Sequence, residues 1–288
     1  TGIVTAAGTS VFTNLDISGD IDVDGTTNLD VVDIDGAVDM ASTLVVGGVV
    51  NLSTGSESSP ALFFNSDSDT GIYSGGSNTV VITAGGSNRF YADASTHLGT
   101  LTAGTSNLAL GVNAGNSIES GGNYNVLVGD EAGTAITTGD YNVFVGFVAG
   151  DATTTGRENI AMGGYSLGSN TTGTNNTAVG SGSLQSNTTA DNNTSVGYNS
   201  LAANTTGDRN VAMGGLALDA NTTADGNTAF GYDSLSTNTG SELNVAIGFN
   251  ALRLYNNGSG SGYNTAVGAL AGAAVTTGVQ NTLIGGLA

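Results

Sequence analysis

The chain of 288 residues contains no cysteine, no lysine and a single proline, and arginine occurs only four times. The absence of cysteine excludes disulfides and thiolate metal sites. With 24 acidic residues against four arginines, the formal net charge is −20. This balance argues against nucleic acid as a partner, because phosphate contacts need clustered cations, and it disfavours an anionic membrane surface. Since no run approaches 18 apolar residues, we also expect no membrane insertion.

Charged residues make up 10% of the chain, against roughly 25% in ordinary soluble domains, whereas glycine supplies 47 residues. The chain begins at Thr1, without an initiator methionine or a signal-peptide pattern, and it ends part way through a repeat. We therefore expect it to be a segment of a longer protein.

A short phrase, Asn-x-x-x-Gly, recurs at a fixed interval through the C-terminal two thirds of the chain. Eight of the ten intervals are 17 residues, one is 18 and one is 20. The repeat pairs are Asn107 and Gly111, Asn125 and Gly129, Asn142 and Gly146, Asn159 and Gly163, Asn176 and Gly180, Asn193 and Gly197, Asn210 and Gly214, Asn227 and Gly231, Asn244 and Gly248, Asn264 and Gly268, and Asn281 and Gly285. Such a period is the signature of a stacked repeat architecture.

The residues inside the phrase predict a short strand. The first position after the asparagine is Val, Ile, Leu or Thr, the second is mostly Ala, and the third is always large and apolar. We expect the third position to form the core, with residues Leu110, Val128, Val145, Met162, Val179, Val196, Met213, Phe230, Ile247, Val267 and Ile284. The seventh position is always Ala or Ser and predicts a bend or second strand, and the Asn-Thr-Thr stretches predict turns.

A unit of 17 residues cannot bury its own apolar side, but successive units can do so by stacking, about 4.8 Å apart. The sequence therefore predicts an all-β fold in which residues 99–288 form a parallel β-solenoid or β-roll of about eleven repeats. Because so thin a coil holds a marginal core, we expect a homo-oligomer, most simply a trimer about the fibre axis. The alternating alanines would then allow neighbouring chains to approach closely.

Two further zones precede the solenoid. Residues 1–55 alternate apolar residues with aspartate, and Asn14-Leu15-Asp16-Ile17 recurs as Asn28-Leu29-Asp30-Val31, a pattern that favours a repetitive β shaft. Residues 56–98 predict a small β meander, with strands at 62–64, 79–83 and 89–92 and an Asp/Gly turn after the first.

The middle zone carries the motifs Phe-Phe-x-x-Asp-x-Asp-Thr-Gly-Ile-Tyr, then Val-Val-Ile-Thr-Ala-Gly-Gly, then Arg-Phe. This set resembles a module of bacteriophage tail fibres, where it commonly lies between the shaft and the distal domain. The solenoid phrase is similar to the heads of trimeric autotransporter adhesins, whose units contain Asn-Ser-Val-Ala-Ile-Gly and build a trimeric β-roll. The repeat here is longer, so the cross-section and handedness of that roll do not transfer.

Three motifs suggest chemistry, and each has a simpler explanation. Asp20, Asp22 and Asp24 open an EF-hand-like loop, but Val31 stands where the bidentate glutamate is needed. We expect no cofactor and no metal site, with adventitious calcium at the Asp-rich shaft as the open alternative. His97, the only histidine, lacks the partners of a catalytic triad. Asp219 and Asp225 resemble a glycosidase pair, but turn positions explain them equally well.

Repeated surface residues offer a second kind of site. Asn170, Asn187, Asn204 and Asn221 fit the glycosylation pattern and, with Thr171, Thr188, Thr205 and Thr222, predict a polar ladder along one edge. A ladder of this kind offers a surface to a glycan lattice or to ice. Tyr165, Tyr198, Tyr232 and Phe249 recur just after the strand glycine, and two roles stay open for them: stacking on sugars or packing across a chain interface.

The sequence thus predicts a structural and adhesive fibre segment of a phage tail, not an enzyme, that assembles as a homotrimer. Its expected partners are other phage tail or baseplate proteins and a host-surface glycan or protein receptor, and its expected location is the virion tail. The alternative is a bacterial trimeric adhesin or extracellular filament subunit on the cell surface. A polysaccharide depolymerase is a more remote alternative.

Overall fold

The computed structural model describes residues 50–64, 66–76, 79–92, 98–99, 104 and 106–288. No helix occurs among these residues, and every regular element is a β-strand. The predicted shaft falls almost wholly outside the described residues, as do Asp20, Asp22, Asp24 and His97. The described strands belong to one compact unit, Leu52–Ala288. They form a small antiparallel sheet, a long parallel sheet and a two-stranded pair.

The small sheet is a five-stranded meander in which sequence neighbours pair antiparallel. Its strands are β1 (Leu62–Phe64), β2 (Asp67–Gly76), β3 (Thr79–Ala84), β4 (Ser87–Ala92) and β5 (Leu98–Gly99). The Asp/Gly turn expected after the first strand is instead the beginning of the long strand β2. Gly71 makes this pairing fit, because a Cβ atom there would collide with the carbonyl group of Leu62 on the neighbouring strand.

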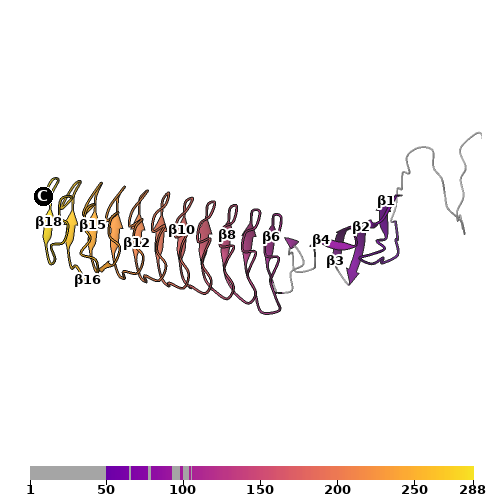
Figure 1. Cartoon of the computed structure of the whole chain (residues 1–288). Helices are drawn as coiled ribbons and strands as arrows, with labels where there is room; N and C mark the ends of the chain where they lie inside the picture. Colours follow the sequence, from indigo (N-terminus) through magenta and orange to yellow (C-terminus); the bar gives the residue numbers. More distant parts are fainter. Residues whose placement is uncertain (1–49, 65, 77–78, 93–97, 100–103, 105) are drawn as a thin grey trace, which may run out of the picture. The chain divides into compact units, whose positions relative to one another are not determined.

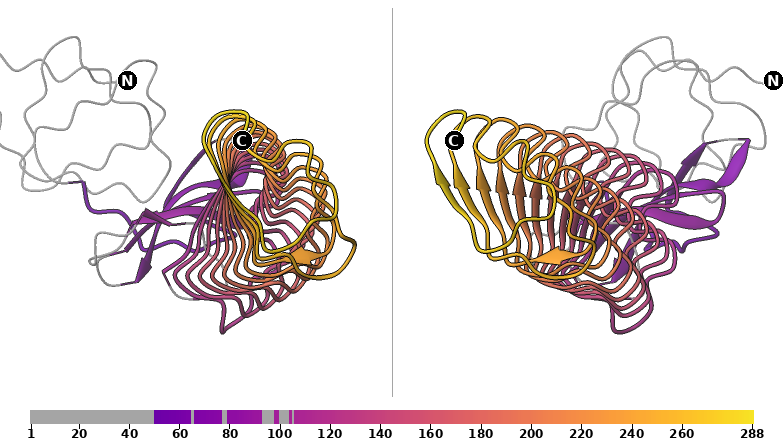
Figure 2. Two further views of the ribbon diagram at one scale, coloured as in Figure 1. Left: turned by 90° about the vertical axis from the view of Figure 1, so that its left-hand side faces the viewer. Right: turned by 60° about the vertical axis from the view of Figure 1, so that its left-hand side comes forward.

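The long sheet is the wall of a parallel β-solenoid of about ten turns, which confirms the predicted architecture of the repeat region (Figure 1). Each coil contributes one three-residue strand: β6 (Leu108–Leu110), β7 (Val126–Val128), β8 (Val143–Val145), β9 (Ile160–Met162), β10 (Thr177–Val179), β11 (Thr194–Val196), β12 (Val211–Met213), β13 (Thr228–Phe230), β15 (Val245–Ile247), β17 (Thr265–Val267) and β18 (Thr282–Ile284). Figure 2 shows these strands side by side along one wall of the stacked coils. The rest of each coil is turns and bends.

Every strand pairs with the corresponding strand of the next coil in register. Thr177, for example, lies opposite Thr194, which lies opposite Val211. The 20-residue interval keeps this register, because Val245 still pairs with Thr265. Its extra residues lie in the turn region, where β14 (Ser241–Glu242) pairs with β16 (Gly260–Ser261). From the spacing between strands, the solenoid is about 50 Å long.

The side-chain orientation within the strand is the reverse of the predicted one. The middle residue of each strand faces the coil interior, as Leu127, Phe144 and Ala178 show by their complete burial. Because successive side chains on a strand point to opposite sides, the first and third residues face outward. The alanine row, expected on a face between chains, therefore lines the interior.

The prediction that the third-position residues form the core of the coil is wrong for the single chain. These side chains are exposed or half-buried, with exposed fractions of 45% for Leu110, 52% for Phe230 and 71% for Ile284. The residues on the outward face are Leu110, Val128, Val145, Met162, Val179, Val196, Met213, Phe230, Ile247, Val267 and Ile284. The coil is too narrow to hold them together with the residues from its other wall.

The actual core comes from the middle strand residue, from the seventh and eighth positions after the repeat asparagine and, in some coils, from an apolar residue at the eleventh position. The eighth position is leucine in six consecutive coils, and all six side chains are fully buried: Leu167, Leu184, Leu201, Leu218, Leu235 and Leu252. Their φ angles lie between 49° and 53°, in the left-handed region. That conformation costs about 1–2 kcal/mol in a non-glycine residue, and full burial of a leucine offsets it with about 1.5–3 kcal/mol.

In coils that have glycine at the eighth position, the space that the leucine side chain would occupy is filled by a side chain from the strand on the opposite wall. Gly115, Gly133 and Gly150 occupy the eighth position in the first three coils, and a Cβ atom at Gly133 would lie 2.8 Å from Leu127 Cδ2 and 3.1 Å from Phe144 Cδ2. Where the eighth residue is leucine, the middle strand residue is mostly alanine. This part of the interior is thus filled in two alternative ways, by glycine facing a large residue or by leucine facing a small one.

This exchange predicts a strong coupling between Leu201 and Ala212. Leu201→Gly is expected to cost about 2–4 kcal/mol of unfolding free energy, the cavity loss minus the relieved backbone strain. Ala212→Leu alone is expected to cost about 1–3 kcal/mol by overpacking. In the double variant the new leucine fills the cavity, as Leu127 does opposite Gly115, so at least about 1 kcal/mol should be recovered. Urea unfolding followed by circular dichroism measures all three, and purely additive losses would contradict the arrangement.

Candidate functional surfaces

The repeat asparagines form a continuous ladder inside the solenoid and not on its surface. Asn193 is fully buried, its Oδ1 accepts a hydrogen bond from the backbone N–H of Asn210 at 2.9 Å, and its Nδ2 donates to the carbonyl of Gly207 at 2.9 Å. The backbone N–H of Asn193 donates in turn to Asn176 Oδ1 at 3.0 Å. Each asparagine therefore joins its own coil to both neighbours and pairs buried backbone groups that would otherwise be costly.

The strand glycines face a different constraint. Gly146 has a φ of 139°, and a Cβ atom there would lie 2.7 Å from the backbone carbon of Gly163 in the next coil. The two recurring residues of the phrase thus have separate roles, since the asparagine supplies hydrogen bonds and the glycine lets the coils stack closely at a bend.

The glycosylation-like asparagines are also internal, which corrects the prediction that they lie on an exposed edge. Asn187 and Asn204 are fully buried. Asn204 Nδ2 donates to Asn187 Oδ1 at 3.2 Å and to the carbonyl of Gly207 at 2.9 Å. Asn170 and Asn221 belong to the same second ladder. Their amides replace an apolar core residue because they satisfy the carbonyl groups that this turn directs inward, so they present nothing to solvent.

The threonines that follow these asparagines do form an edge, but their hydroxyl groups are engaged. Thr205 Oγ1 donates to the carbonyl of Thr222 at 3.0 Å, and Thr188 Oγ1 donates to that of Thr205 at 3.0 Å. Thr171 and Thr222 make the equivalent bonds. This half-buried row therefore reinforces the stacking of the coils. The next threonine along each turn, such as Thr206, is exposed.

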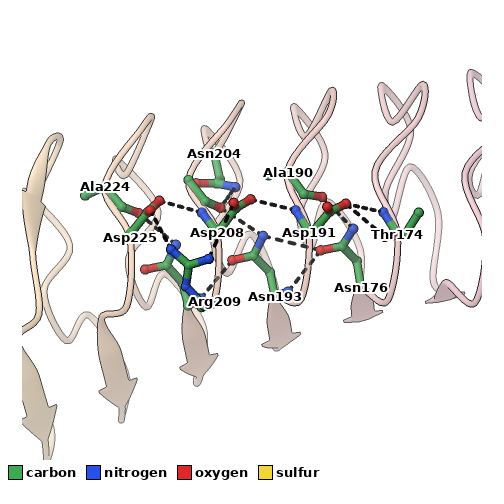
Figure 3. A network of polar contacts seen from close by, with 12 residues as sticks. Thr174, Asn176, Ala190, Asp191, Asn193, Asn204, Asp208, Arg209, Ala224 and Asp225 are labelled. Atoms are coloured by element: carbon green, nitrogen blue, oxygen red, sulfur yellow. Dashed lines mark hydrogen bonds and ion pairs between the residues drawn. The ribbon is translucent and has the colours of Figure 1, made fainter.

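Near this edge, acidic side chains of adjacent coils form a third ladder (Figure 3). Asp191 accepts from the N–H of Thr174 at 2.7 Å, Asp208 from that of Asp191 at 2.8 Å, and Asp225 from that of Asp208 at 2.8 Å. Arg209 lies 2.9 Å from Asp225 and 3.8 Å from Asp208. Backbone donors and one arginine thus stabilise a row of like charges, with the exposed ion pairs worth about 1 kcal/mol or less.

Asp219 and Asp225 lie in different environments. Asp225 accepts a hydrogen bond from a backbone N–H and forms an ion pair with Arg209. Asp219 instead lies near Asp233, and the two carboxylates interact electrostatically. Burial raises the pKa of Asp219, and the Asp233 carboxylate raises it further. Burial likewise raises the pKa of Asp151, the equivalent residue of another coil. The described contacts pair Asp225 with a backbone N–H and Arg209 and place Asp219 near Asp233, and none of them joins Asp219 to Asp225 as an acid pair.

Exposed aromatic side chains contact one another along the solenoid. The rings of Tyr232 and Phe249 are stacked with centroids 6.0 Å apart, and Tyr165 meets Phe147 edge-on at 5.4 Å. Tyr198 occupies the same position as Tyr232 two coils earlier and is 62% exposed. Another stacked pair, Tyr124 and Tyr141 at 4.9 Å, precedes the repeat asparagine. The sequence predicted Tyr165, Tyr198, Tyr232 and Phe249 as a recurring set of aromatics. The ring contacts between neighbouring coils follow from the stacking of the coils.

The largest candidate surface is the outward face of the parallel sheet. It consists of the first and third residues of the eleven strands, and every one of them is apolar or threonine. The third position is always apolar, whereas the first is threonine in β10, β11, β13, β17 and β18. A continuous apolar strip therefore runs the full length of the solenoid, which is unusual for a surface in contact with water.

The small sheet also exposes apolar side chains on one face. Leu62, Ile72 and Ile82 lie opposite one another on β1, β2 and β3, with exposed fractions of 56%, 41% and 41%. A shallow hollow of about 410 Å³ beside them is lined by Leu52, Leu62, Ile72, Tyr73 and Val80, among others. The residues that the structure describes thus leave part of the hydrophobic surface of this sheet exposed.

In the described part of the chain, no three or more His, Asp or Glu side chains gather closely enough to hold a metal ion. The same residues include no helix with the length and apolar character needed to span a membrane. No known protein family matches the chain, and no curated protein or solved structure is detectably similar to it.

The asparagine ladder predicts a large cost for losing one member. Asn193→Ala removes the acceptor for the Asn210 N–H, which is left buried without that partner, and it removes one of the two donors to the Gly207 carbonyl, which Asn204 still satisfies. A loss of about 1–3 kcal/mol of unfolding free energy is expected. Thr206→Ala, on the exposed turn of the same coil, should change stability by less than about 0.5 kcal/mol. Equal urea midpoints for the two variants would contradict a structural role for the ladder.

Asp219 predicts a pH-dependent stability change. Its pKa is higher in the folded than in the unfolded chain, so its contribution to stability is full below the unfolded value, about 4, and is lost as the pH rises through the folded value. The ionised carboxylate therefore opposes folding at pH 7. Asp219→Asn is expected to raise the urea midpoint at pH 7 and to give no advantage at pH 3.

The matched control is Asp225→Asn, which removes a charge from the same coil but weakens contacts to the Asp208 N–H and Arg209. It should lower the midpoint at pH 7 or leave it unchanged. An equal rise for both variants would mean that the relief of net negative charge, not the burial of Asp219, controls the effect.

Proposed function

We propose that the chain is a structural and adhesive fibre segment of a phage tail that assembles as a homotrimer and serves host attachment without catalysis. The observation that supports this most is the stack of in-register coils, each joined to the next by asparagine, threonine and backbone hydrogen bonds. Such a stack spans distance with little sequence information, because every coil contacts only its neighbours.

The middle zone supports a phage origin. Its sequence resembles a tail-fibre module, and the strands β1 to β4 cover the segments that carry the resemblance. In this proposal the N-terminal side connects to other tail or baseplate proteins. The solenoid either contacts a glycan or protein receptor or holds a receptor-binding tip away from the virion.

Cell binding tests the adhesive role. The chain lacks cysteine, so Thr206→Cys on the exposed turn gives a single labelling site outside the interior ladders. The labelled protein is expected to bind the surface of a subset of strains in a panel of bacteria, measured by flow cytometry, and to compete with adsorption of a phage that infects those strains. Binding to no strain by a protein with an intact solenoid, checked by circular dichroism, would contradict adhesion.

The same assay separates the alternatives. Release of soluble oligosaccharide from the bound cells, abolished by Asp219→Asn or Asp225→Asn, would replace the proposal with a depolymerase. Binding to cells without any competition with phage adsorption would favour a bacterial surface adhesin built on the same repeat.

A further inference from the structure

The outward face of the parallel sheet has a composition that sets it apart from the rest of the molecule. The chain carries 24 acidic residues and four arginines, yet none of these lies at an outward position of the eleven strands. Large side chains on this face are substantially exposed, including Met162 at 43%, Phe230 at 52% and Ile247 at 39%. In a lone chain these side chains would remain in water at a free-energy cost that burial would remove.

The dimensions of this face suit a permanent interface. Eleven strands at about 4.8 Å spacing and three residues at about 3.3 Å give a strip about 50 Å long and 10 Å wide. The exposed aromatics Phe147, Tyr198, Tyr232 and Phe249, two residues beyond the third strand position, widen the apolar surface. The flat projection of this strip has an area of about 500 Å², and the protruding side chains make the accessible area larger. That area is at the upper end of the apolar patches found on monomers. It approaches the roughly 800 Å² that each partner buries in a stable complex.

The charge distribution permits a copy of this chain as the occupant. Two chains that each carry a net charge of −20 repel one another across any surface that presents carboxylates, such as the edge with Asp191, Asp208 and Asp225. The sheet face carries no charge, so self-association at this face avoids direct contact between like charges.

The length of the apolar strip and the spacing of its coils also favour a second copy of this chain as the occupant. An apolar strip that continues through every coil is covered completely only by a partner of equal length and equal repeat. A second copy has both properties, and rotation about an axis parallel to the solenoid brings identical coils to the same height. The third-position row is apolar in every coil, whereas the first-position row includes five threonines, so the third-position row belongs nearer to that axis.

We infer that copies of this chain associate through the outward face of the sheet, with the third-position row from Leu110 to Ile284 at the centre of the interface. This inference rests on the proposed homotrimeric fibre and specifies the surface that builds it. It also gives the residues that the sequence predicted as core a burial site between chains and not within one coil.

A pair of matched double variants tests the face. Val179→Asp with Val196→Asp places two carboxylates on paired outward positions of β10 and β11. Thr189→Asp with Thr206→Asp places two carboxylates at equivalent exposed turn positions of the same two coils. Both variants add the same charge at the same coil spacing, so they differ only in the surface that carries it.

Light scattering coupled to size-exclusion chromatography measures the outcome, and circular dichroism verifies that each variant keeps its β signal. The unmodified chain and the threonine variant are expected to have three times the monomer mass of 28.2 kDa, and the valine variant should shift to the monomer mass.

Three outcomes of this experiment decide whether the outward face is the interface. Loss of the trimer in the valine variant alone supports the face. A trimer in all three proteins overturns the face and leaves the proposed function standing. A monomeric unmodified chain overturns the face and the trimer together, and cell binding then tests attachment independently.

Cysteine substitution gives an answer that does not depend on weakening the assembly. Since the chain has no cysteine of its own, Val196→Cys supplies one thiol on the outward sheet face and Thr206→Cys supplies one on the exposed turn of the same coil. Under mild oxidation, Val196→Cys is expected to yield a disulfide-linked dimer on a non-reducing gel, whereas Thr206→Cys should remain uncrosslinked. Equal crosslinking of the two, or crosslinking of Thr206→Cys alone, overturns the inferred face.

Discussion

The hydrogen bond from the backbone N–H of one repeat asparagine to the side chain of the preceding one is the interaction on which the solenoid depends. It acts inside the coil, away from water, where an unpaired N–H or carbonyl group costs about 1–3 kcal/mol. Because the donor and acceptor must lie at the same point of successive coils, the chain between them has to close one circuit. The 20-residue interval shows how strict this is: Asn264 still donates to Asn244 Oδ1, at 3.2 Å, and the additional residues are accommodated in the turn region.

Around this ladder the interior tolerates two solutions to one packing problem. Coils with leucine at the eighth position accept a strained backbone in exchange for a buried side chain, and coils with glycine there are filled by Leu127 or Phe144 from the opposite wall. The asparagines at 187 and 204 add a second polar ladder within the same narrow space. The interior is therefore part apolar and part hydrogen-bonded, and the hydrogen bonds of both ladders run along the direction of stacking.

The sequence alone was sufficient to predict the period, the short strands and the parallel stacking. The sequence predicted the wrong side of the strand as the inward one, because both sides of each strand carry residues with low polarity. Hydrophobicity assigns Val196 to a core, and only the limited width of the coil shows that the small residue beside it lies inside. The buried state of Asn204 was also missed, since Asn-Thr-Thr resembles an ordinary exposed turn until the inward carbonyl of Gly207 is known. The left-handed leucines have no counterpart in sequence propensities, which assign such angles to glycine.

The in-register stack has a consequence for how such a molecule changes over generations. Every coil presents one pattern of donors, acceptors and small residues to the preceding coil and the complementary pattern to the following coil, so an in-frame duplication of one repeat inserts a coil that already matches both neighbours. Length then varies in increments of one coil, about 4.8 Å, without a new folding problem. A lineage with this fold can adjust its reach gradually, by copying or losing single repeats, while the ends of the molecule remain as they were.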